Sequence, residues 1–132
     1  MMVSEAMNRA PVTVVPDATI EEAVALARRT GSEHLLVMDE ETLVGVLCTC
    51  DLRHAGEGER VCDCMSVPVV TVRPDAPVED AALTMRECSV GCLPVALGGL
   101  VLGMLGDTEL RSCGIPPPRP HHHCARRTAA PA

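Results

Sequence analysis

The sequence predicts an α+β protein in which two tandem β-α-β-β-α units pack as a pseudo-twofold pair. The main observation is an internal repeat: a shift of 58 residues aligns Met7 with Met65 and continues without a gap as far as Arg53 and Arg111. Within each copy, short apolar runs alternate with a segment of helical periodicity. A copy of this size has one apolar sheet face and little to cover it, so we expect the two copies to share a core.

The first copy begins with a strand followed by a helix. The β-branched run Val12–Val15 predicts a short strand. Thr19 with Glu22 three residues later is typical of a capping box at the start of a helix. Apolar residues then recur at helical spacing until Gly31, a residue type that commonly follows the last turn of a helix. We therefore expect an amphipathic helix between Thr19 and Gly31.

Two strands and a second helix complete each copy. Residues 35–38 and 43–48 are apolar and are joined by an acidic turn, which predicts a β-hairpin. A short second helix is expected to begin near Cys50 and to end at Gly56, because glycine disfavours a helix interior. The second copy repeats these elements, with Pro77 in the first turn of its first helix, where proline is tolerated.

The repeat divides the chain into four segments. The first motif covers residues 3–56, a glycine- and charge-rich connector covers 57–62, and the second motif covers 63–114. Residues 115–132 begin with a proline-rich spacer and are expected to be disordered. This tail contains His121–Cys124, a run that could scavenge a metal ion or form only a solvated end.

The composition excludes several classes of function. The chain has 132 residues, a formal net charge of −7, no aromatic residue and no lysine. Without lysine there can be no Schiff-base lysine and no Walker-type phosphate loop. Without aromatic rings the chain cannot stack exposed bases, and its negative charge repels a phosphate backbone, so we expect no nucleic-acid partner. No catalytic triad is visible either, so we expect no enzyme.

Two segments are relevant to the cellular compartment in which the protein is expected. Met1–Pro11 lacks the apolar stretch of a signal peptide. Cys88–Gly106 carries no charge and is long enough to span a membrane, but the pair Gly98-Gly99 between two apolar runs favours a hairpin. The eight cysteines are therefore interpreted as cytosolic thiols rather than a disulfide framework. We expect a cytoplasmic protein without a membrane partner.

Several short motifs stand in the same order in both copies. They comprise Met7, 11–14, 16–17 and 45–52 in the first copy, and 63–66, 68–72, 93–95 and 103–110 in the second. In order, spacing and duplication these motifs resemble a tandem pair of cystathionine β-synthase (CBS) domains, also called a Bateman module, over about residues 3–114. The resemblance implies a regulatory module rather than a catalyst, with no required cofactor.

In that family, an aspartate at the start of the second helix accepts hydrogen bonds from both ribose hydroxyls of an adenosine-type ligand. The resemblance gives Asp51 this role and places Cys48 where an assisting hydroxyl residue usually stands. The other residues that it assigns to this first site are Val46, Thr49, Cys50, Pro68, Val69, Val70 and Cys92. A second, degenerate cleft would have Glu109 in place of the aspartate, together with Met104, Thr108, Pro11, Val12 and His34.

The resemblance also implies the ligand class and the partners. AMP, ATP and S-adenosylmethionine are the expected regulatory ligands. The family often places a basic residue just before the strand at 93–95, where it meets the phosphates of the ligand, but this chain has Gly91 and Cys92 there. ATP is therefore expected to bind less well than a neutral or cationic adenosyl compound. A homodimer and a regulated protein, not identified by the sequence, are the other implied partners.

Two alternatives stay open. Under the resemblance, Cys48, Cys50 and Cys92 would line the site beside Asp51, and three thiols could bind zinc or copper(I) or act as a redox switch. Cysteine also packs as a small apolar residue, which would explain the same positions without a site. The other alternative is a ligand-free interaction module that docks onto a partner.

Overall fold

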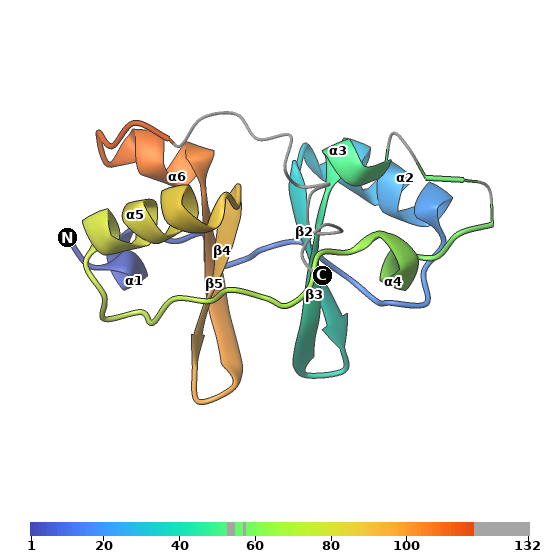
Figure 1. Cartoon of the computed structure of the whole chain (residues 1–132), viewed down its shortest axis with the longest axis horizontal. Helices are drawn as coiled ribbons and strands as arrows, with labels where there is room; N and C mark the ends of the chain where they lie inside the picture. The colour runs from blue at the N-terminus through green and yellow to red at the C-terminus, as the bar shows by residue number, and fades with distance from the viewer. Residues whose placement is uncertain (53–54, 57, 118–132) are drawn as a thin grey trace. The chain divides into compact units, whose positions relative to one another are not determined.

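A computed structural model describes residues 1–52, 55–56 and 58–117 (Figure 1). The tail predicted to be disordered lies outside these residues from position 118 onward, and so does the His121–Cys124 run. The chain forms two compact units. One is Val12–Val69, called here the Asp51 unit, and the other joins Met1–Pro11 to the chain from Val70 onward, called here the Glu109 unit.

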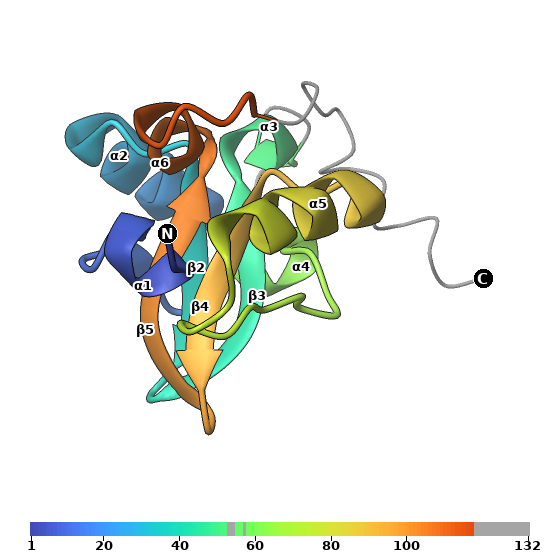
Figure 2. The same cartoon turned by 90° about the vertical axis from the view of Figure 1, so that its left-hand side faces the viewer.

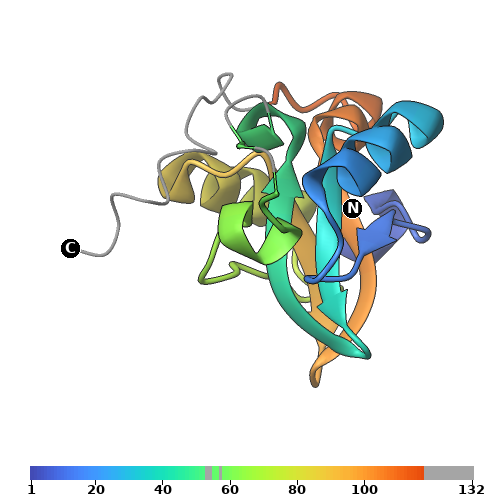
Figure 3. The same cartoon turned by 90° about the vertical axis from the view of Figure 1, so that its right-hand side faces the viewer.

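Over its described residues, the Asp51 unit consists of a three-stranded sheet and three helices (Figure 3). Its elements are β1 (Thr13–Val14), α2 (Ile20–Thr30), β2 (His34–Asp39), β3 (Thr42–Cys48), α3 (Thr49–Leu52) and α4 (Val61–Cys64). The central strand, β2, pairs in parallel with β1 and antiparallel with β3. Its core contains buried residues of α2, β2 and β3, together with Leu52 of α3 and with Val61 and Cys64 of α4.

The predicted caps of helix α2 are confirmed. The hydroxyl of Thr19 accepts a hydrogen bond from the Glu22 N–H at 3.1 Å, and the Glu22 carboxylate accepts one from the Thr19 N–H at 2.9 Å. Gly31 ends the helix with φ 69°, a left-handed conformation that glycine adopts without steric cost. The sequence therefore determines both ends of this helix locally.

The Glu109 unit repeats this plan with a two-stranded sheet (Figure 2). Its elements are α1 (Val3–Ala6), α5 (Val78–Cys88), β4 (Cys92–Leu97), β5 (Leu100–Gly106) and α6 (Asp107–Ser112). The turn between β4 and β5 is Gly98-Gly99, with φ of 61° and 86°, so the predicted hairpin is confirmed. Over the described parts of the chain, no helix combines the length and apolar character required to cross a membrane.

Two predictions for the second copy were wrong in detail. The strand expected there, equivalent to β1, is reduced to one bridge between Val72 and Val95. In the first copy, the Leu36 N–H donates to the Val12 carbonyl, whereas the equivalent residue of β4 is Pro94, which has no N–H to donate. Pro77 is the N-cap residue of α5, in extended conformation, rather than a residue of its first turn.

The structure adds two one-turn helices that the sequence pattern did not predict. Helices α1 and α4 are related by the repeat, yet each packs in the unit that holds the sheet of the other copy. The Val61 N–H donates to the Ala18 carbonyl at 2.9 Å, and the Val3 N–H donates to the Ala76 carbonyl at 2.8 Å. The compact units therefore differ from the sequence repeats by a reciprocal exchange of their first segments.

Candidate functional site

The junction between β3 and α3 positions the residues assigned to the first site. Cys48 is the last residue of β3 and pairs in register with His34 at the start of β2. The next residue, Thr49, donates its N–H to the Glu33 carbonyl at 2.9 Å, just before β2. These contacts fix the backbone where it changes from strand to helix. They therefore also fix the positions from which the side chains of the first helical turn extend.

Asp51 is a buried carboxylate in this turn. Its side chain is 6% exposed, and its Oδ2 accepts a hydrogen bond from the Cys48 N–H at 3.3 Å. The bond joins residues three apart at the start of α3, so Asp51 acts as an acid that caps this helix. The carboxylate is therefore fixed relative to the end of β3.

Glu109 has the same local role in the other unit. Its Oε1 accepts a hydrogen bond from the Gly106 N–H at 2.7 Å, and Gly106 is the repeat equivalent of Cys48. The structure therefore shows a capping function for both acids. They differ in exposure, because Asp51 is buried and Glu109 is only half-buried.

The segment predicted to face the base lies beside β3. The Ser66 N–H donates to the Val46 carbonyl at 2.8 Å, and the Val46 N–H donates to the Ser66 carbonyl at 3.3 Å. Pro68 and Val69 follow within three residues and belong to the Asp51 unit, as Val46 does. The structure thus brings an aliphatic strand edge and a second aliphatic segment into the unit that contains Asp51.

The remaining predicted residues divide between the two units. Val70 and Cys92 of the first predicted site belong to the Glu109 unit. Of the second predicted site, Pro11, Met104, Thr108 and Glu109 belong to the Glu109 unit, whereas Val12 and His34 belong to the Asp51 unit. Inside the Glu109 unit, the Asn8 N–H donates to the Met104 carbonyl at 2.8 Å, which places the segment before Pro11 along β5.

Two of the three thiols predicted beside Asp51 are in contact. The Sγ atoms of Cys48 and Cys50 lie 3.0 Å apart, and the Cys50 N–H points to the Cys48 Sγ with an N–S distance of 3.5 Å. Across residues 1–52, 55–56 and 58–117, no group of three or more His, Cys, Asp or Glu side chains is arranged to hold a metal ion. Cys48 and Cys50 therefore form a contacting pair in the Asp51 unit.

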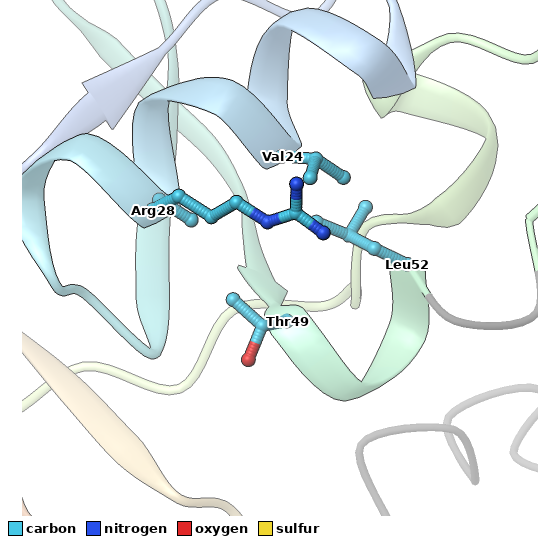
Figure 4. Close-up of a pocket in the computed structure, with 5 residues that line it drawn as sticks. Val24, Arg28, Thr49 and Leu52 are labelled. Atoms are coloured by element: carbon cyan, nitrogen blue, oxygen red, sulfur yellow. The ribbon is translucent and has the colours of Figure 1, made fainter.

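A pocket that the sequence pattern did not predict lies between α2 and α3 (Figure 4). It has a volume of 280 Å³ and is lined by Val24, Ala27, Arg28, Thr49 and Leu52. The Arg28 side chain extends across it toward Val24 and Leu52, so the pocket combines an apolar wall with one guanidinium. The repeat contains the relevant signal, because the equivalent of Ala27 in α5 is the much larger Met85, which is fully buried.

Filling this pocket is expected to stabilise the protein. In Ala27→Met, the new side chain would occupy space that Met85 fills in the other unit. We expect a gain of about 0.5–2 kcal/mol in the free energy of unfolding, which is the usual range for cavity-filling changes. Urea denaturation measures it, and Ala25→Met at an exposed position of α2 is the control for side-chain size alone. A loss of stability in Ala27→Met would show that the pocket cannot accept a side chain.

Comparison with known proteins identifies a family for this sequence. The sequence model of the CBS domain matches twice, over residues 3–58 and 61–114. A homoserine O-acetyltransferase of Methanosalsum zhilinae is 30% identical over 115 residues, which is 82% of this chain and 23% of the relative. The chain spans between 21% and 24% of the length of the first three curated relatives that it matches.

Two solved structures are similar to the chain over most of its length. CBSX2 in complex with AMP is 26% identical with a TM-score of 0.77, covering 86% of this chain and 95% of that one. The cytosolic domain of the Mg²⁺ channel MgtE in complex with ATP is 30% identical with a TM-score of 0.71, covering 81% of this chain and 46% of that one. Both are complexes with an adenine nucleotide.

Proposed function

The chain belongs to the CBS domain family, and on that premise we propose that it is a regulatory module that binds an adenosine-type ligand at a site built on Asp51. CBS domain pairs are typically regulatory rather than catalytic. The observation that carries the proposal is the buried Asp51 carboxylate, held at the end of β3 by the Cys48 N–H. The nucleotide complexes of the two similar structures support the ligand class.

The proposed role of Asp51 is to accept hydrogen bonds from the two ribose hydroxyls. A carboxylate offers about four acceptor positions, so it can cap a helix and receive two hydroxyl donors together. Hydrogen bonds to a charged acceptor are roughly twice as strong as those between neutral groups. A short side chain whose position is fixed by a backbone bond also loses little side-chain entropy when the ribose binds.

The proposed contacts of the adenine ring are aliphatic. Val46 lies on β3, and Pro68 and Val69 lie on the segment that is paired to it through Ser66. The chain has no Phe, Tyr or Trp, so we propose that apolar contact supplies this part of the affinity. Val70 and Cys92 are further contacts that we propose from the family resemblance.

The charge of the chain favours ligands with few phosphates. The formal net charge is −7, and like charges repel within the screening distance of about 8 Å at physiological ionic strength. We therefore propose that AMP and the cationic S-adenosylmethionine bind more tightly than ATP. The Glu109 site is proposed to bind an adenosyl ligand weakly, because the longer side chain shifts the carboxylate by one methylene.

We also propose the setting in which the module acts. As the resemblance implies, the chain is expected to form a homodimer in the cytoplasm and to control a regulated protein. Leu83 on α5, 46% exposed, is apolar surface that such a contact would cover. Since the chain spans only part of its first curated relatives, their catalytic activities belong to their other parts under this proposal.

A thermal-shift series tests the ligand class. Reduced protein is heated with AMP, ATP, S-adenosylmethionine, 2′-deoxy-AMP or inorganic phosphate. A ligand at 100 times its Kd stabilises the folded state by about 2.7 kcal/mol, so AMP is expected to raise the Tm by several degrees. The deoxy nucleotide should give a smaller shift because it lacks one of the two hydroxyls, and phosphate should give none. No shift with any adenosyl compound, or an equal shift with phosphate, would contradict the proposal.

A further inference from the structure

We propose that Cys48 and Cys50 form a reversible disulfide with each other, which makes the end of β3 an oxidisable site. Their Sγ atoms lie 3.0 Å apart, and a disulfide requires a separation of about 2.05 Å, so the sulfurs need to approach by only about 1 Å. Residues two apart in the chain also have Cα atoms no more than about 7 Å apart, close to the range that disulfides span. The inference concerns thiol chemistry and stands whether or not a nucleotide binds.

The geometry favours a disulfide over a zinc site. Two thiolates that share a tetrahedral zinc ion with bonds of about 2.3 Å must lie about 3.8 Å apart. The observed 3.0 Å lies between this value and a covalent bond, so a metal would have to push the sulfurs apart. A structural zinc site also needs four ligands, and across the described residues no group of even three metal-binding side chains is present.

Exposure gives the two thiols different roles. Cys50 is half-buried, whereas Cys48 is 6% exposed, so a hydroperoxide from solvent reaches Cys50 first. The deprotonated Cys50 sulfur attacks one peroxide oxygen, the O–O bond breaks, and the leaving hydroxide takes a proton to become water. The Cys48 sulfur then attacks the Cys50 sulfenic acid and the S–O bond breaks, and the leaving hydroxide takes up the Cys48 thiol proton to become a second water. A thiol such as glutathione reverses the reaction by exchange.

The chain contains a second Cys-x-Cys sequence that serves as an internal control. Cys62 and Cys64 lie on α4, and residues two apart on a helix do not face each other. Cys62 is exposed, whereas Cys64 is buried in the core and its Sγ contacts the Glu59 carboxylate at 3.5 Å. The two pairs have the same spacing in sequence, so a difference in their oxidation reports their geometry.

Peptide mapping tests the proposal on the full chain. Reduced protein is titrated with hydrogen peroxide, remaining thiols are alkylated, and the chain is cleaved after arginine. One product, residues 30–53, contains Cys48 and Cys50 and no other cysteine, and another, 61–86, contains Cys62 and Cys64. We expect peptide 30–53 to become lighter by two hydrogens and to lose both alkylation sites at peroxide concentrations at least tenfold below those that oxidise peptide 61–86. Glutathione should restore both thiols.

Two variants separate the proposed reaction from general oxidation. In Cys48→Ser, which removes the resolving thiol, Cys50 should be trapped as a sulfenic acid that reacts with dimedone, whereas Cys62→Ser should leave the disulfide in peptide 30–53 unchanged. The proposal is overturned if peptide 30–53 keeps both thiols while 61–86 is oxidised, if both peptides oxidise at the same peroxide concentration, or if Cys48 and Cys50 are found in disulfides with other cysteines.

Discussion

Asp51→Asn is expected to raise the Kd for AMP by about 100-fold or more. Under the proposed function, the carboxylate accepts two ribose hydroxyls, and each hydrogen bond to a charged group contributes about 1.5–3 kcal/mol. An amide retains one acceptor oxygen but replaces the other with a donor, so at least one of these bonds is lost and the other is weakened. A loss of about 3 kcal/mol in binding free energy corresponds to slightly more than a 100-fold change in Kd at 25 °C.

The choice of asparagine separates binding from folding. Its oxygen can still accept the Cys48 N–H, so the start of α3 keeps its cap, whereas Asp51→Ala would also lose about 0.5–2 kcal/mol of stability. Glu109→Gln is the matched control, because it makes the same change at the repeat-equivalent acid and keeps an acceptor for the Gly106 N–H. Calorimetric titration of the three variants measures the effect. Equal losses of AMP affinity in Asp51→Asn and Glu109→Gln, or no loss in either variant, would contradict the proposed role of Asp51 as the specific ribose acceptor.

Gly103→Ala is expected to lower the free energy of unfolding by about 3 kcal/mol, at the upper end of the range for overpacked positions. A Cβ atom at Gly103 would lie 2.6 Å from the Asn8 carbonyl oxygen and 2.8 Å from the Met7 Sδ. The carbonyl cannot move away easily, because it accepts the Met104 N–H at 3.0 Å and the Asn8 N–H donates to the Met104 carbonyl in return. The substitution therefore forces apart the segment and the strand that hold the Glu109 unit together.

Alanine substitutions at two other glycines serve as comparisons for this prediction. Gly45 is the repeat equivalent of Gly103, but the nearest atoms to its Cβ position belong to the flexible Met65 side chain, so Gly45→Ala should cost less. A Cβ at Gly56 would meet only the Glu59 carboxyl carbon at 4.0 Å, so Gly56→Ala should change stability little. Urea denaturation gives all three values. The expected loss of unfolding free energy is largest for Gly103→Ala, smaller for Gly45→Ala and smallest for Gly56→Ala. Any other order would mean that the segment at Asn8, which pairs with β5, is held less firmly than its hydrogen bonds indicate.

Local signals account for the parts of the fold that the sequence predicts well. The ends of α2 depend on Thr19, Glu22 and Gly31, which act within one turn, and the β4–β5 hairpin depends on Gly98-Gly99 between apolar runs. Helices α1 and α4 are each four residues long and show too little periodicity for the sequence pattern to predict them. Their exchange between units also depends on long-range hydrogen bonds that no local pattern encodes.

In the candidate site, too, some features follow from the local sequence and others only from the folded structure. The sequence identifies Asp51 and its helical turn, but the bond from the Cys48 N–H and the burial of the carboxylate depend on how β3 meets α3. Cys48-x-Cys50 and Cys62-x-Cys64 are identical in spacing, and only the backbone conformation brings the first pair together. The pocket beside α2 is visible in sequence only by comparing Ala27 with its repeat equivalent, Met85.

Calorimetric titration of the reduced wild-type chain with AMP tests the central claim most directly. The proposal predicts saturable binding of one AMP per chain, weakened in 2′-deoxy-AMP because a ribose hydroxyl is missing, and weakened again in Asp51→Asn. Absence of saturable heat with AMP and with S-adenosylmethionine, in protein that unfolds cooperatively, would contradict it and would favour a ligand-free interaction module on the CBS fold.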